Sequence, residues 1–164
     1  MVYGLFESKF GTGAVILSSD GAVVEVFLPA AGIEKMVNKK YPEAVRKSIK
    51  EAAMLESYFA GKDESFRDVN VDFSGLPLFT VKVLNAIRKI PRGETVTYKQ
   101  AAAMAGNIKA ARAAGSALSR NPVPVIIPCH RVLAKNGLGG FSAGIKWKLR
   151  LLEIEKRKLT GRVA

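Results

Sequence analysis

A chain of 164 residues in which 48% are hydrophobic can form one ordinary domain or two small ones, and its net charge is +12. No segment approaches the roughly 18 uninterrupted apolar residues of a membrane span, and the N-terminus lacks the pattern of a signal peptide. The single cysteine excludes an internal disulfide, and one Cys with one His excludes a structural zinc site. We therefore expect a cytoplasmic protein without a membrane partner or a bound metal.

The basic residues are concentrated in the second half of the chain. Residues 1–75 contain 9 Lys and Arg and 11 Asp and Glu, a net charge of −2. Residues 76–164 contain 17 Lys and Arg and three Glu, a net charge of +14. A polyanion is attracted to such a surface, and nucleic acid is the commonest polyanionic partner. The charge therefore favours nucleic-acid binding over the alternative of a basic surface that serves solubility alone.

The first residues of the chain predict a small sheet. Three runs rich in β-branched and aromatic residues have the pattern of a β-meander, at residues 2–8, 13–18 and 22–29. Ser19-Asp20-Gly21 is a tight-turn signal between the last two runs. Residues 69–74 are a candidate for one further strand.

Residues 41–61 predict an amphipathic helix, with Pro42 in its first turn, an apolar stripe that starts at Val45 and Ile49, and Gly61 at its end. Ser74-Gly75-Leu76-Pro77 then marks a joint. We expect an N-terminal sheet-plus-helix domain over residues 1–75 and a C-terminal DNA-binding and catalytic domain over residues 76–164.

The second half of the chain predicts mainly helices, at residues 77–90, 97–106, 107–120 and 145–158. Thr97 and Asn107 are the expected N-caps of the second and third, which are joined through Gly106 like a helix-turn-helix. A hairpin of helices that serves packing alone is the alternative. The expected fold class is α/β (α+β), with a small N-terminal sheet and a mostly helical C-terminal domain that contains a winged-helix-like helix-turn-helix.

The third of these helices has an unusually smooth surface. Ala110, Ala111, Ala113 and Ala114 dominate it, and its cations are Lys109, Arg112 and Arg120. A helix that reads bases in the major groove carries Arg, Asn and Gln aimed at the base edges. A helix of alanines instead lets its backbone approach DNA closely, which suits sequence-neutral contact in a narrow groove. A lone Arg112 among alanines could reach into the base stack, although a surface or salt-bridged Arg is an equal alternative.

The sequence "NPVPVIIPCHRV" places the only cysteine, Cys129, directly before the only histidine, His130. A lone Cys is usually a small buried hydrophobic residue. Here three prolines stiffen the approach, and we expect the basic half to favour the thiolate. A nucleophilic Cys with a His base needs a third group to orient the imidazole, and Glu153 and Glu155 both qualify by spacing.

The same residues resemble the active-site signature of the 6-O-alkylguanine-DNA alkyltransferases, the methylated-DNA–protein-cysteine methyltransferases. The Pro-Cys-His-Arg core after Asn-Pro-Val-Pro is highly specific, and the resemblance extends from Gly93 to Glu155. The first half is similar to the variable N-terminal domain of the family only in general pattern.

The resemblance implies a role for each matching residue of the reaction centre. Cys129 accepts the alkyl group, His130 deprotonates it through a water, and Glu155 orients His130. Asn121 braces the turn between the recognition helix and the active-site loop. Tyr98 contacts the DNA phosphate, promotes rotation of the base and helps to protonate the leaving group.

The resemblance also implies contacts to DNA and to the base. Arg112 fills the space of the flipped base, Ala110 and Ala111 face the minor groove, and Lys109 lies beside them. The remaining contacts are to the substrate base, from Ser142, the Val132 backbone and Phe141. Many members of the family carry Tyr where this chain has Phe141, so a hydroxyl contact is lost there.

The implied function is DNA repair: removal of the alkyl group from 6-O-alkylguanine in duplex DNA, once per molecule, by a monomer that binds largely without sequence preference. No methyl-donor cofactor is expected, because the glycine-rich segment at 135–144 does not satisfy G-x-G-x-x-G. A damage-binding relative without catalysis is the main alternative, and it would lack the acceptor cysteine. A helix-turn-helix regulator and a Cys–His hydrolase are weaker alternatives.

Overall fold

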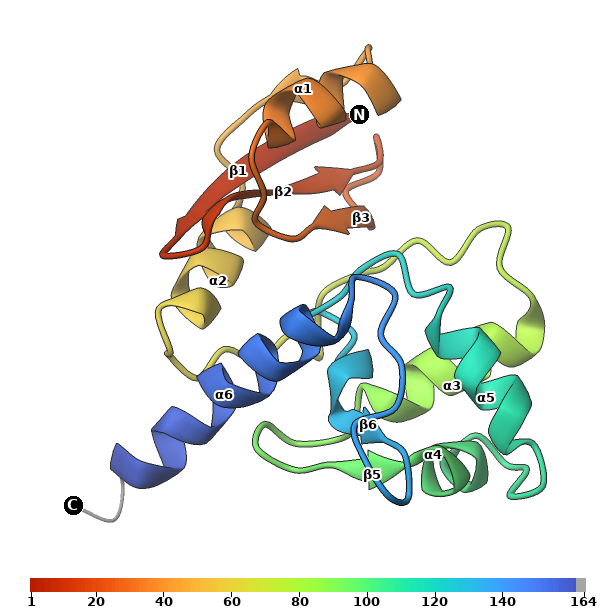
Figure 1. The fold of residues 1–164 in the computed structure, drawn as a ribbon. Coiled ribbons are helices and arrows are strands. Elements are labelled where there is room, and N and C mark those ends of the chain that lie inside the picture. Colours follow the sequence, from red (N-terminus) through yellow and green to blue (C-terminus); the bar gives the residue numbers. More distant parts are fainter. Residues whose placement is uncertain (162–164) are drawn as a thin grey trace. The chain divides into compact units, whose positions relative to one another are not determined.

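The computed structural model describes residues 1–161, with side chains up to residue 156. The chain forms two compact units, Met1–Phe73 with Pro122–Pro124 and Ser74–Asn121 with Val125–Ala164 (Figure 1). Within the described residues, no helix combines the length and the hydrophobicity needed to cross a membrane. The division of function between the two halves of the chain stays a prediction.

The first unit is built on a four-stranded sheet in the order β3-β2-β1-β4. Its strands are β1 (Val2–Ser8), β2 (Gly11–Leu17), β3 (Val23–Phe27) and β4 (Val45–Arg46). The first three are antiparallel neighbours, which confirms the predicted meander. The predicted strand at 69–74 is reduced to a single bridge between Val71 and Val23.

Two helices complete this unit, α1 (Ile33–Lys40) and α2 (Lys50–Phe59). The predicted helix over residues 41–61 is wrong in its first half, and α1 was not predicted. Tyr41 precedes a proline and therefore avoids the helical region, with φ −129°. The backbone N–H groups of Val45 and Lys47 instead donate to the carbonyls of Met1 and Tyr3 at 3.2 and 2.9 Å, so the segment extends the sheet.

The second unit is mostly helical, with a two-stranded parallel sheet. Its elements are α3 (Leu78–Ile87), β5 (Val96–Thr97), α4 (Tyr98–Met104), α5 (Ala111–Leu118), the 3-10 helix η1 (Cys129–Arg131), β6 (Val132–Leu133) and α6 (Ile145–Gly161). Helices α3, α4 and α5 pack together around buried side chains such as Val83, Leu84, Ala101 and Ala114. Neither η1 nor the β5–β6 pair was predicted.

The turn between α4 and α5 differs from the prediction in one respect. Thr97 caps α4 as expected, in a capping box with Gln100. Asn107, however, does not cap α5, which starts at Ala111. The Asn107 side chain accepts from the Lys109 N–H at 3.1 Å, and its carbonyl accepts from the Ala110 N–H at 3.0 Å. Asn107 therefore stabilises the turn before the helix.

The chain reaches η1 through a strained turn. Val125 has φ 75°, in the left-handed region that β-branched residues avoid, and its side chain is buried. Such a conformation costs on the order of 1–3 kcal/mol and persists only where surrounding contacts impose it. The Cys129 N–H then donates to the Ile127 carbonyl at 2.8 Å, which starts the tight turn that carries Cys129.

Candidate active site

A cavity of about 270 Å³ opens in the second unit. It is lined by side chains and backbone from α4, α5, η1 and the glycine-rich loop: Tyr98, Gly115, Leu118, Ser119, Cys129, Gly140, Phe141 and Ser142. Sites for drug-sized ligands measure roughly 300–1,000 Å³, so this cavity suits a single small ring system. Cys129 is the only nucleophilic thiol of the chain, and it lies in this wall.

Burial determines the protonation state of Cys129. Burial raises the pKa of the Cys129 thiol to about 11, although the Asn121 side chain and the charge of Lys148 act in the opposite direction. Asn121 Nδ2 lies 3.2 Å from Sγ and also donates to the Ile127 carbonyl at 2.9 Å. The positive charge of Lys148 favours the thiolate, as expected of the basic half, but loss of water outweighs this effect. Cys129 rests as the thiol.

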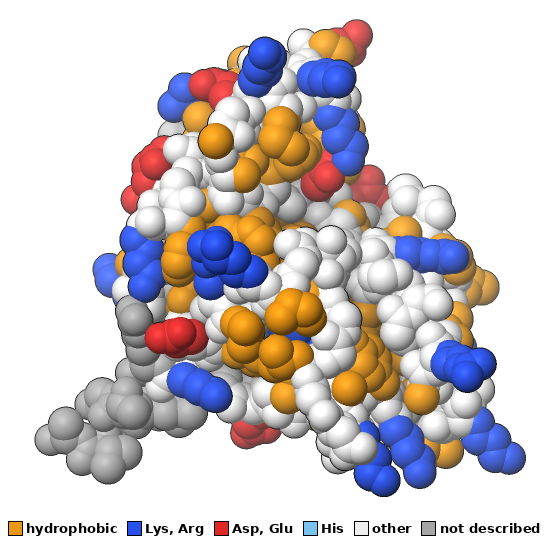
Figure 2. Space-filling model, in the orientation of Figure 1, with side chains coloured by type: hydrophobic (Ala, Val, Ile, Leu, Met, Phe, Trp, Pro, Cys, Tyr) orange, Lys and Arg blue, Asp and Glu red, His pale blue; other side chains and the backbone are white. Residues whose placement is uncertain are grey.

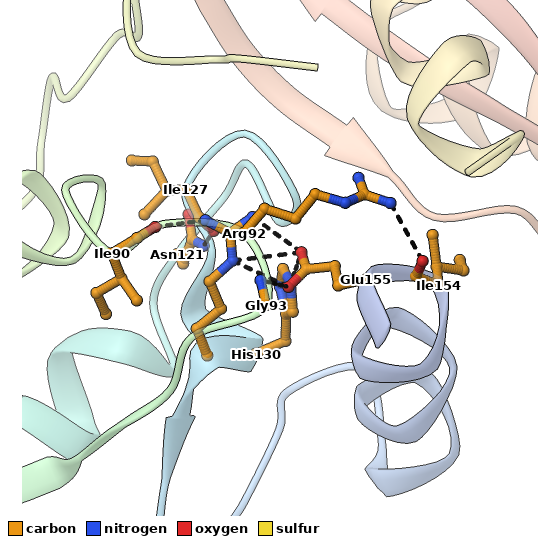
Figure 3. A network of polar contacts seen from close by, with 9 residues as sticks. Ile90, Arg92, Gly93, Asn121, Ile127, His130, Ile154 and Glu155 are labelled. Carbon is orange, nitrogen blue, oxygen red and sulfur yellow. Dashed lines mark hydrogen bonds and ion pairs between the residues drawn. The ribbon is translucent and has the colours of Figure 1, made fainter. Parts of the chain in front are cut away.

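His130 is fully buried and bonded to Glu155, with Nε2 and Oε1 2.6 Å apart (Figure 3). Burial lowers the pKa of His130 and outweighs the opposing effect of Glu155, so the imidazole is neutral at pH 7. Nε2 then carries the proton that is donated to Glu155, and the buried Nδ1 is the basic nitrogen. No histidine is visible on the face drawn in Figure 2, consistent with this burial.

Arg131 holds the carboxylate of Glu155 from the other side. Its Nε donates to Oε2 at 3.1 Å and its Nη2 to Oε1 at 2.9 Å, while Nη1 donates to the Ile90 carbonyl at 2.5 Å. The Gly93 N–H lies 3.5 Å from Oε2. Burial alone would raise the pKa of Glu155, but the hydrogen bond from His130 and the hydrogen bonds and charge of Arg131 hold it far below its usual value. Glu155 is therefore a permanent anion.

Lys148 and Tyr98 hold the glycine-rich loop of the cavity wall. Lys148 Nζ donates to the carbonyls of Val132, Leu138 and Gly140 at 2.7, 2.5 and 3.0 Å. The Tyr98 hydroxyl accepts from the Gly140 N–H at 3.2 Å. Lys148 Nζ also lies 5.8 Å from the centre of the Tyr98 ring. The loop therefore has a fixed position beside Cys129.

Known proteins show the same combination of sequence and fold. The family model of the 6-O-methylguanine DNA methyltransferase DNA-binding domain matches residues 78–157. A methylated-DNA–protein-cysteine methyltransferase of Metallosphaera sedula is 37% identical over 93% of this chain and 92% of its own length. The chain belongs to this methyltransferase family. The relative of the same name from Saccharolobus solfataricus is also 37% identical, over 97% of this chain and 98% of its own length.

Solved structures of the methyltransferase family have the same fold. Mycobacterium tuberculosis OGT in complex with DNA matches with a TM-score of 0.78 and 31% identity, over 96% of this chain and 94% of its own. An O6-methylguanine DNA methyltransferase of Methanococcus jannaschii matches with a TM-score of 0.64 and 32% identity, over 93% of this chain and 92% of its own. These matches confirm the predicted α+β fold class.

In this methyltransferase the predicted reaction-centre residues lie together. Hydrogen bonds join Asn121 to Cys129 and His130 to Glu155. The cavity wall contains Tyr98, Phe141 and Ser142 as well as Cys129. Val132 is buried in β6, its carbonyl accepts from Lys148, and it is not among the described residues that line the cavity. Its contact with the base stays a prediction.

The predicted DNA-contacting residues lie at the start of α5, away from the hydrogen-bonded network. Arg112 and Lys109 are exposed, and Ala110 and Ala111 are half-buried. The face in Figure 2 shows Lys and Arg over α4 and α5 without acidic side chains among them. One turn further along α5, Gly115 lines the cavity. The same helix therefore carries the exposed cations at its start and forms part of the cavity wall.

Sequence reasoning missed Arg131 and Lys148. The position of Lys148 did contain a signal, because Lys148, Leu151 and Glu155 recur at intervals of three and four on the apolar face of a helix. All three are buried. A lysine on such a face needs buried acceptors, which the loop carbonyls provide.

We predict that Gly139→Ala destabilises the glycine-rich loop. Gly139 has φ 73°, and an added Cβ would lie 2.6 Å from the Tyr98 hydroxyl and 2.8 Å from its ring. We expect a loss of about 1–3 kcal/mol in the free energy of unfolding and slower alkylation of Cys129. Thermal unfolding and alkylation kinetics measure both effects. Gly137→Ala in the same loop is the control, because its Cβ meets open space, and equal losses in the two variants would contradict the prediction.

We also predict that Glu155→Gln lowers both stability and activity, because it leaves Arg131 buried without its anion. The expected loss is about 3 kcal/mol in the free energy of unfolding. The wild type should lose this stabilisation as the pH falls below the ordinary carboxyl pKa of 4.5, since the unfolded state takes up the proton first. Denaturant unfolding between pH 3 and 7 tests this.

The matched control is Glu153→Gln, which removes an exposed carboxylate from the same helix. It should leave the pH dependence of unfolding as in the wild type. A Glu155→Gln variant with the wild-type slope below pH 4.5 would show that the folded-state charge of Glu155 is not what stabilises the site.

Proposed function

We propose that this protein repairs 6-O-alkylguanine in double-stranded DNA by irreversible transfer of the alkyl group to Cys129, once per molecule. The observation that carries the proposal is the position of Cys129: its thiol lines a cavity that suits one small ring system, such as a purine, and lies next to a buried His130–Glu155 pair. An alkylated base buried in a duplex is out of reach of any side chain, so the base must first rotate into this cavity.

The buried thiol requires a base at the moment of reaction. His130 Nδ1 takes the proton of Sγ through a water, and Glu155 stabilises the imidazolium that forms. The thiolate sulfur then bonds to the alkyl carbon as the bond from that carbon to the guanine oxygen breaks. The oxygen or the ring of the leaving guanine takes up one proton, so the products are an S-alkyl cysteine and unmodified guanine. The thioether is stable, and each molecule acts once.

The Tyr98 hydroxyl is the donor that we assign to the leaving group. The tyrosinate that remains recovers a proton from solvent, and the His130 imidazolium releases one to solvent. The Tyr98 hydroxyl lines the cavity and bonds to the backbone of Gly140, which keeps it on the wall of the cavity where the base would lie. Ser142 and Phe141 line the same cavity and would contact the alkylated side of the base. Phe141 supplies apolar contact only, since it has no hydroxyl.

Helix α5 is the surface that we assign to DNA. Arg112 is exposed near its start, among alanines, and it would enter the stack to fill the space of the rotated base. Lys109 would contact a phosphate, and Ala110 and Ala111 would allow the helix to approach the minor groove. Sequence-neutral binding follows from the lack of side chains that read base edges. We expect a monomer to suffice, because one chain contains every residue of the scheme.

The main alternative, a relative that binds damage without repairing it, is not favoured, because the acceptor Cys129 is present in the cavity wall. That this protein acts in the cytoplasm stays a prediction from sequence.

We predict that incubation with duplex DNA containing 6-O-methylguanine adds one methyl group to Cys129 and exhausts the protein stoichiometrically. Mass spectrometry of the intact protein and of its peptides measures this. Cys129→Ser should bind the same duplex with unchanged affinity and accept no methyl group. An unmodified Cys129, or repeated turnover by one molecule, would refute the proposed function.

We predict that Arg112→Ala slows the repair of duplex DNA by roughly 10- to 100-fold, because rotation of the base costs a few kcal/mol that the arginine offsets. Reaction with the free base 6-O-methylguanine should stay within about twofold of wild type. Arg120→Ala, which removes another exposed cation near the end of α5, is the control for general charge. Equal losses on duplex and free base would contradict the base-replacement role.

A further inference from the structure

Lys148 is buried completely, which is rare for a lysine. Burial lowers the pKa of its ammonium group, because the charged form loses its water. The three carbonyl oxygens of Val132, Leu138 and Gly140 replace that water. Three backbone carbonyls therefore serve to keep one lysine charged inside the protein. The exposed surface of the same unit already carries many other cations. A buried ammonium group cannot contact DNA, so its positive charge needs another explanation.

The surroundings of Lys148 show which group its charge acts on. Its Nζ bonds to the carbonyl of Gly140, which lines the cavity together with Cys129, and lies 5.8 Å from the centre of the Tyr98 ring. The charge of Lys148 lowers the pKa of both Cys129 and His130. Glu155 on its own helix is already neutralised by Arg131 and bonded to His130. The charge of Lys148 therefore lacks a carboxylate partner among the described residues. The group that gains a negative charge during the reaction is Cys129.

We infer that Lys148 is a positioning residue for alkyl transfer: it fixes the glycine-rich wall of the cavity and holds a positive charge that stabilises the Cys129 thiolate as it forms. The inference rests on the proposed use of Cys129 as the nucleophile. A cation fixed by three carbonyls is already oriented before the reaction, so it stabilises the developing charge without rearrangement. The same hydrogen bonds hold Gly140 beside the base-sized cavity.

The two parts of this role separate experimentally. Lys148→Gln keeps a hydrogen-bond donor for the carbonyls but removes the charge, and Lys148→Arg keeps the charge. Lys146→Gln removes an exposed charge two residues away and is the control. The readout is the rate at which iodoacetamide alkylates Cys129 between pH 6 and 11.5, since this small neutral reagent reports the thiolate fraction without DNA or base rotation.

We expect Lys148→Gln to slow alkylation roughly tenfold at pH 8, where the wild-type lysine is charged, because loss of the charge raises the pKa of Cys129 by about one unit. The deficit should shrink above the ordinary lysine pKa of 10.5, because the wild-type Lys148 then loses its own charge. Lys148→Arg and Lys146→Gln should keep the wild-type rate at pH 8. A purely structural lysine would give a deficit of equal size at all pH values, and that result in a folded Lys148→Gln variant would overturn the inference.

The charge of Lys148 can also be measured in the wild-type protein, so this second test does not depend on whether a variant folds. Nitrogen NMR of the Lys148 side chain at pH 7 should show a protonated ammonium in slow exchange with water, and a neutral amine would overturn the inference. Wild-type protein is incubated with the methylated duplex in parallel. If Cys129 accepts no methyl group from this duplex, the proposed function is refuted. The iodoacetamide rates and the NMR signal of Lys148 would still test the role of the lysine.

Discussion

The buried carboxylate of Glu155 is the interaction on which the second unit depends. An anion out of water is tolerated only where it is fully paired, and here His130 and Arg131 both bond to it. These two residues lie in η1, while Glu155 lies in α6. Arg131 also reaches the Ile90 carbonyl after α3. One carboxylate therefore determines where the last helix and the tight turn of Cys129 lie relative to each other.

Burial also decides the chemistry of the site, through a competition between loss of water and local charge. His130 stays neutral and Cys129 stays a thiol because loss of water outweighs the favourable partners of each. A resting thiol is a poor nucleophile, which protects the single-use residue from stray electrophiles. Reactivity then requires the proton to leave at the moment when a substrate fills the cavity.

Local signals made much of the fold predictable. The capping box at Thr97, the glycine that ends α4 and the β-branched and aromatic runs of the first strands depend on neighbours in sequence, and the structure contains all of them. The motif likewise indicated His130 and Asn121. The errors involve tertiary contacts: residues 45–47 pair with the edge of β1, and the state of Cys129 depends on how deeply it is buried. Neither the free edge of a strand nor depth of burial can be read from spacing.

The adjacent Cys129 and His130 are each the sole residue of their type in the chain. A thiol-directed label has one target, and an imidazole spectrum has one source. The protonation and occupancy of the reaction centre can thus be followed in the unaltered protein, without the removal of competing residues. The molecule contains its own spectroscopic reporter, and that reporter lies at the atoms where the chemistry takes place.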